Sequence, residues 1–71
     1  MQNPYKNGSF YHQQFNTYVG WHQHETTDAL MKKRDELRQE ANNFLRHSWK
    51  SMQDMDFHAD VIDALIKARA E

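Results

Sequence analysis

The 71-residue chain is predicted to be a small all-α protein, and two observations predict this fold class. The one proline and both glycines lie within the first 20 residues, so no strong helix breaker follows Gly20. Apolar residues then recur at intervals of three and four, which is the spacing of one helix face. We therefore expect a single helical domain over residues 1–71.

Residues 1–8 are expected to form an extended arm that leads into a short helix over residues 9–22. Ser9 can cap this helix after an Asn7-Gly8 turn. The helix carries aromatic residues at helical spacing: Tyr11, Phe15 and Tyr18. A helix of about 12 residues is marginal in isolation, so this one must dock on another part of the protein.

The clearest helix is predicted over residues 27–53. Thr26 or Thr27 can cap it, and Asp28 lies where the helix dipole favours an acid. Its apolar stripe is thin at the start and widens later, through Leu30, Leu37, Ala41, Phe44, Leu45, Trp49, Met52 and Met55. We expect the main packing contacts toward its C-terminal half.

Residues 53–56 are predicted as a turn, with Asp54 or Asp56 capping a third helix over residues 57–70. A short connection favours an antiparallel hairpin, and one bent helix through residue 70 is the competing prediction. In the hairpin, Leu65 and Ile66 would cover three residues of the long helix: Phe44, Leu45 and Trp49. A homodimer is also expected, because so short a chain buries only about 60% of its unfolded surface.

The composition limits the kinds of site the protein can contain and indicates where it is located. There is no cysteine, which excludes disulfides and thiolate metal sites. A charged fraction of 27% and a mean hydropathy of −1.09 indicate a soluble chain, and no apolar run approaches the roughly 18 residues of a membrane span. The N-terminus lacks signal-peptide character, so we expect a cytoplasmic protein without a membrane partner.

The net charge of −1 is unevenly distributed. Lys6 is the only Asp, Glu, Lys or Arg residue among residues 1–24, whereas residues 54–71 hold five acids and two bases. A strongly basic face, as needed for binding a phosphate backbone, is missing. An acidic C-terminal helix suits a basic partner, or occupation of another protein's nucleic-acid site.

The five histidines do not have the spacing of a metal site. On a helix His22 and His24 lie about 200° apart, and no H-x-x-x-H or H-E-x-x-H pair occurs. We expect ordinary surface or half-buried histidines, no metal and no cofactor. The chain also lacks a nucleophile motif and a glycine-rich phosphate loop, so no enzymatic activity is expected.

Six of the nine aromatic residues fall within residues 3–24. They can complete a three-helix core, form a docking surface, or stack on unpaired bases, and the last needs more cations than Lys6. We expect a non-enzymatic regulator, inhibitor or adaptor that binds another protein, a type common among phage-encoded inhibitors of host machinery. The predicted partner-binding residues are Tyr5, Tyr11, Tyr18, Trp21, Asp56, Asp60 and Asp63.

Two alternatives belong to other classes of function. A nucleic-acid- or ribosome-associated protein would use the basic residues Lys32, Lys33, Arg34 and Arg38. Acids interleave with these bases, so a solvated helix face is favoured over a nucleic-acid site. The second alternative is a structural subunit of a larger assembly.

Asn3-Pro4-Tyr5 followed by Gly20-Trp21 resembles the Pro-Tyr and Gly-Trp elements of ribosome modulation factor and related small phage-borne proteins. The resemblance covers less than a third of the chain, with a different spacing. The chain also lacks the basic character of that family, so no residue role is carried over from it.

Overall fold

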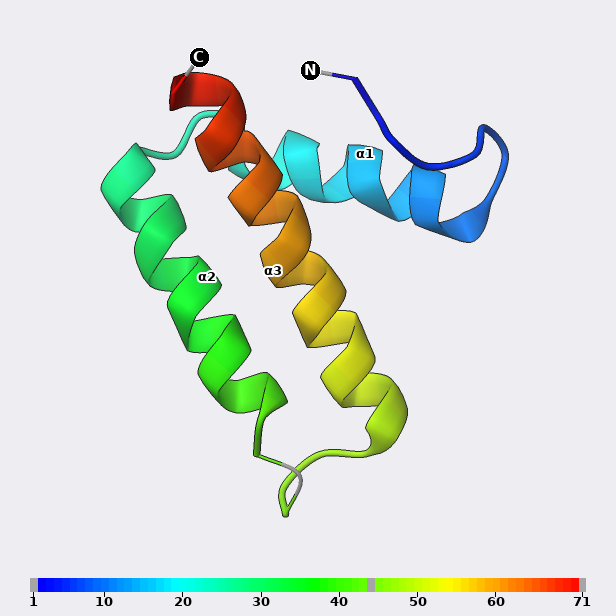
Figure 1. The fold of residues 1–71 in the computed structure, drawn as a ribbon, viewed down its shortest axis with the longest axis vertical. Helices are drawn as coiled ribbons and strands as arrows, with labels where there is room; N and C mark the ends of the chain where they lie inside the picture. Colours follow the sequence, from blue (N-terminus) through cyan, green and yellow to red (C-terminus); the bar gives the residue numbers. More distant parts are fainter. Residues whose placement is uncertain (1, 44, 71) are drawn as a thin grey trace.

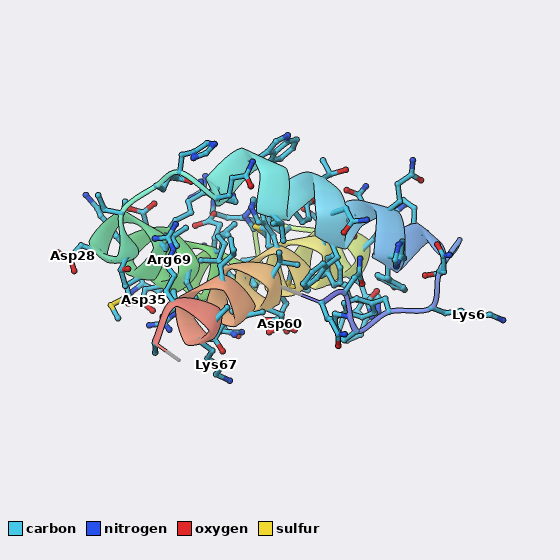
Figure 2. The ribbon with its side chains drawn as sticks, turned by 90° about the horizontal axis from the view of Figure 1, so that it is seen from above. Lys6, Asp28, Asp35, Asp60, Lys67 and Arg69 are labelled. Carbon is cyan, nitrogen blue, oxygen red and sulfur yellow. The ribbon has the colours of Figure 1, made fainter. Side chains whose placement is uncertain are left out.

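The computed structural model describes residues 2–43 and 45–70, and this part of the chain is all-α, as predicted. It contains α1 (Phe10–His22), α2 (Thr27–Ala41) and α3 (Trp49–Ala70). α2 and α3 lie side by side and share the most extensive helix–helix contact (Figure 1). α1 packs against α3 and lies on one face of the layer that α2 and α3 form (Figure 2).

The first two helices begin where the sequence predicts. The Ser9 hydroxyl accepts the His12 backbone N–H at 3.1 Å, directly after Gly8, whose φ of 88° lies in the left-handed region that glycine tolerates. The Thr26 hydroxyl accepts the Ala29 backbone N–H at 3.1 Å at the start of α2. Short polar side chains therefore satisfy backbone N–H groups at both helix starts.

The predicted helix over residues 27–53 is wrong, and so is a continuous helix through residue 70. α2 ends at Ala41, residues 42–48 connect the helices, and residues 53–56 lie inside α3 rather than in a turn. Asn42 donates its backbone N–H to the Arg38 and Gln39 carbonyls at the end of α2. Ser48 accepts the Ser51 backbone N–H at 3.2 Å, so it caps α3 instead of Asp54 or Asp56.

The core lies at the opposite end of α2 from the one expected. Leu30, Ile62 and Leu65 form it, and one side chain from each helix packs around it: Val19, Leu37 and Ile66. Leu45 and Trp49, expected under Leu65 and Ile66, are 91% and 72% exposed. The cause is that α2 ends at Ala41: Leu45 falls in the segment between the helices and Trp49 is the first residue of α3, whereas Ile62 and Leu65 lie in the second half of α3. Phe44, the third residue expected there, lies outside the described residues.

No helix within residues 2–43 and 45–70 has both the length and the apolar content to cross a membrane.

Leu30→Ala is predicted to lower the free energy of unfolding by about 2–5 kcal/mol, because Leu30 is fully buried between α2 and α3. Urea denaturation followed by circular dichroism measures the change. Met31→Ala is the matched control, since Met31 is the next residue of α2 and is exposed. Equal losses in the two variants would contradict this position of the core.

Candidate functional site

The N-terminal arm is tied to α1 by the side chain of Asn3. Its amide nitrogen donates to the His12 carbonyl at 2.8 Å and to the Asn16 side-chain oxygen at 3.0 Å. Its side-chain oxygen accepts the Tyr5 backbone N–H at 2.9 Å, and the His12 ring bonds the Tyr5 carbonyl at 3.2 Å. The Asn3-Pro4-Tyr5 segment therefore fixes the Tyr5 ring over α1.

An aromatic cluster joins the arm and α1 to α3, and its centre is Phe57. The Phe57 ring lies 5.4 Å from Tyr5, 5.2 Å from Tyr11 and 6.1 Å from Tyr18, measured between ring centroids. Phe15 lies 5.8 Å from Tyr5 and is only 3% exposed. Tilted and edge-on contacts at these separations are favourable, so the cluster docks α1 on α3.

The side of α1 that adjoins its contact with α3 carries what we call the aromatic stripe, made of Phe10, Tyr11, Tyr18 and Trp21. These positions fall within about 100° of one another around the helix axis. Phe10, Tyr11 and Trp21 are 62%, 52% and 65% exposed, while Tyr18 is half-buried. The stripe therefore presents two aromatic pairs, Phe10–Tyr11 and Tyr18–Trp21, with Gln14 between them.

The surroundings of the stripe are almost uncharged. A shallow hollow of about 50 Å³ lies between the stripe and Phe57, and Asp54 lies at its edge. Burial raises the pKa of the Tyr18 phenol, and the nearby Asp54 carboxylate raises it further. The hollow is far smaller than the roughly 300 Å³ of a small-molecule site, so the stripe suits a macromolecular surface.

Next to the stripe, a histidine pair links α1 to α3. The Nε2 atoms of His22 and His58 are 2.8 Å apart, and the other nitrogen of His22 contacts the Glu25 carboxylate. The His58 ring stacks on Tyr18 with a centroid distance of 4.0 Å. Burial, and secondarily the nearby His22 and Lys33, lowers the pKa of His58 from 6.5 to about 4, although Glu25 opposes this shift.

This pair departs from the sequence prediction for the histidines. His22 is buried, and its partner is His58 rather than the neighbouring His24 considered from the sequence. The two residues are 36 positions apart, so no local spacing could have indicated the contact. Within the described residues, no three or more His, Asp or Glu side chains are placed to hold a metal ion.

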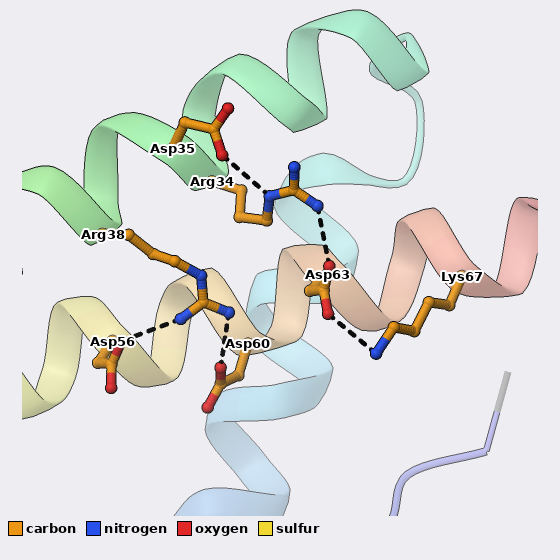
Figure 3. Close-up of polar contacts among 7 residues, drawn as sticks. All are labelled: Arg34, Asp35, Arg38, Asp56, Asp60, Asp63 and Lys67. Carbon is orange, nitrogen blue, oxygen red and sulfur yellow. Dashed lines mark hydrogen bonds and ion pairs between the residues drawn. The ribbon is translucent and has the colours of Figure 1, made fainter.

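The three predicted acidic residues and two of the four predicted basic residues bind each other across α2 and α3 (Figure 3). Arg34 donates to Asp63 at 2.9 Å, and Arg38 donates to Asp56 at 3.1 Å and to Asp60 at 3.0 Å. Burial raises the pKa of the Asp63 carboxyl, but hydrogen bonds and charges from Lys67 and Arg34 outweigh it and leave the pKa below its ordinary value.

The structure therefore does not bring all predicted partner-binding residues to one place. The aromatic residues gather along α1, whereas Asp60 lies on the side of α3 away from α1 (Figure 2). Of the four basic residues, Lys32 and Lys33 are exposed, while Arg34 and Arg38 are held in the ion pairs.

A second apolar surface, which the sequence did not predict, lies where α2 and α3 are connected. Leu45 and Trp49 are exposed there, as described above, beside an open groove of about 400 Å³. The groove is lined by Ala41, Asn42, Trp49, Met52, Gln53 and Asp56. Asn42 and Asn43, which disfavour a helix interior, are the local signal that the helix ends before Leu45 and Trp49.

No family model matches this chain, and no curated protein or solved structure matches it either.

Tyr5→Ala is predicted to lower the free energy of unfolding by about 1–3 kcal/mol, because the Tyr5 ring packs on Phe15 and Phe57. Trp21→Ala should change it by no more than about 0.5–1 kcal/mol, since Trp21 is largely exposed. Denaturant unfolding of both variants tests this distinction. A larger loss for Trp21→Ala would show that the stripe belongs to the core.

Arg38→Glu is predicted to lower the free energy of unfolding by about 1 kcal/mol, because it places a third carboxylate beside Asp56 and Asp60. Added salt should recover part of the loss by screening the repulsion. Thermal unfolding at low and high NaCl measures both effects. Lys32→Glu makes the same charge change on an exposed position of α2, and an equal effect there would argue against the ion pairs.

Proposed function

We propose that this protein is a non-enzymatic regulator, inhibitor or adaptor that binds another protein through the aromatic stripe of α1. The observation that carries the proposal is the exposure of Phe10, Tyr11 and Trp21 beside the face of α1 that is docked on α3. Tyrosine and tryptophan are over-represented among the residues that dominate binding energy at protein interfaces. Exposed aromatic side chains gathered on one side of a helix are typical of an interaction site.

The charges near the stripe indicate the character of the partner. The described part of residues 1–24 has one side chain with a full charge, that of Lys6, and Asp54 lies at the edge of the stripe. The complementary surface is therefore an apolar groove with a basic group at its rim. We assign Asp56, Asp60 and Asp63 to the contact between α2 and α3, because their carboxylates accept bonds from Arg34 and Arg38.

We further infer that α2 and α3 form an antiparallel hairpin. The support is the order of the contacts: Thr27 pairs with Arg69, Arg34 with Asp63, and Arg38 with Asp56. The residue numbers rise along one helix as they fall along the other. A homodimer would benefit so small a core, and the exposed Leu45 and Trp49 offer it an apolar contact.

We also propose a cytoplasmic location, which is the host cytoplasm if the protein is phage-encoded, and the polar composition is consistent with it. The nucleic-acid- or ribosome-associated alternative has less support, because Arg34 and Arg38 are engaged by carboxylates of the same chain.

Trp21→Ala is predicted to weaken partner binding by about 30-fold or more, the effect of removing a residue that dominates an interface. Tagged wild-type protein first captures the partner from the lysate of its native host, and mass spectrometry identifies it. Isothermal titration calorimetry with the purified partner then compares wild type and variants.

Trp49→Ala is the matched control, since it removes an equally large and exposed side chain from the other end of the molecule. Its dissociation constant should stay within about threefold of wild type. If Trp49→Ala abolishes binding while Trp21→Ala leaves it unchanged, the binding surface is the groove at the helix connection and the proposal fails.

A further inference from the structure

The histidine pair constrains where protons can reside at the junction of α1 and α3. His22 donates one N–H to the Glu25 carboxylate, so its Nε2 carries a lone pair in the neutral ring. The Nε2 of His58, 2.8 Å away, must then carry the hydrogen that joins the two rings. The contact is therefore a hydrogen bond with one proton between the two nitrogens.

The pair tolerates one added proton but not two. A singly charged pair keeps one hydrogen between the Nε2 atoms, and the Glu25 carboxylate against His22 balances its positive charge. In a doubly charged pair, both Nε2 atoms carry hydrogens that point at each other across 2.8 Å. The bond is then lost, and two positive charges repel at close range in a partly buried site.

The groups around the pair do not remove this conflict. Glu25 supplies one negative charge from the connection between α1 and α2, and Lys33 adds a positive one from α2. From α1, the neutral rings of Tyr18 and Trp21 pack on His58, with centroids 4.0 Å and 6.2 Å away. The phenol of Tyr18 stays uncharged through the acid and neutral range.

We propose that the His22–His58 pair is a pH-sensitive latch that holds α1 on α3 and thereby keeps the aromatic stripe in its binding arrangement. The link to binding rests on the proposed function. Two members of the stripe, Tyr18 and Trp21, pack directly on His58. When the two histidines separate, these rings lose their support, and α1 retains the contacts around Phe57 and the packing of Val19 on the core.

The pH range in which the latch acts follows from the pKa of His58 when α1 is docked and when it is released. The docked ring takes up its proton with a pKa of about 4, and a released ring does so near 6.5. Between these values the released state binds more protons, so docking weakens as the pH falls from 6.5 toward 4 and is unaffected above 6.5. From pH 7 to pH 5 the docking equilibrium shifts by at most about 30-fold, less where solvent screens the half-buried ring.

The test reads the docking of α1 without a partner, by the fluorescence of Trp21 in a Trp49→Phe background between pH 7 and pH 5. The Glu40 and Asp63 carboxyls stay mostly ionised in this range, because the hydrogen bond from His47 lowers the pKa of Glu40 and those from Lys67 and Arg34 lower the pKa of Asp63. The expected result is increased solvent exposure of Trp21 and a lower melting temperature at pH 5. His58→Gln keeps a hydrogen-bond donor for His22 but cannot titrate, so its pH dependence should be reduced.

His24→Gln is the matched control, because His24 is exposed, and it should behave as wild type. An identical pH profile in wild type and His58→Gln would overturn the latch. If His58→Gln does not fold, the NMR titration of the His58 ring in the intact protein decides: midpoints well below 6 support the latch, and a midpoint near 6.5 overturns it.

Measuring partner affinity at pH 7 and pH 5 distinguishes a failure of the latch from a failure of the proposed function. Weaker binding at pH 5 that His58→Gln restores supports both. If Trp21 becomes exposed at pH 5 while affinity is unchanged, the coupling of the latch to binding is overturned, and the binding surface is not the stripe. If Trp21→Ala abolishes binding but neither docking nor affinity depends on pH, the proposed function stands and the latch fails.

Discussion

The contact between Phe57 and the tyrosines of the N-terminal segment is the interaction on which the rest of the structure depends. α1 has 13 residues, about the length at which an isolated helix is marginal in water, so its stability must come from docking. Phe57 contacts Tyr5 from the arm and Tyr11 and Tyr18 from α1, which joins two segments to α3 at one side chain. The arm and α1 therefore depend on their contact with α3 for stability.

This docking also separates the inward from the outward aromatic side chains. Phe15 faces the core, Tyr5 and Tyr18 contact both the core and the surface, and Phe10 and Trp21 are left outside. On the other side of the molecule, Arg34 and Arg38 pair with acids of α3 and neutralise charges that a partner would otherwise meet. The uncharged, aromatic side of α1 is thus the chemically distinct surface, and the proposed function follows from that contrast.

Local sequence patterns were enough to predict the all-α class. They also predicted where α1 and α2 start, because the capping residues Ser9 and Thr26 bond backbone groups within three residues of their own position. Local patterns did not predict the end of α2. The apolar spacing continues through Leu45 and Trp49, although the helix ends at Ala41 and a new one begins after Ser48. The aromatic residues of the site were identifiable from composition. The contacts of His22 with His58 and of Arg38 with Asp60 join positions far apart in the chain, and no local rule encodes such pairings.

The most direct test of this account is amide hydrogen exchange of the Phe57→Ala variant. We expect the amides of α1 to exchange much faster than in the wild type, while the amides around Leu30 and Ile62 keep most of their protection. That result would show that the aromatic cluster docks α1 on a core that α2 and α3 maintain. Unchanged protection of α1, or equal loss of protection in all three helices, would contradict it.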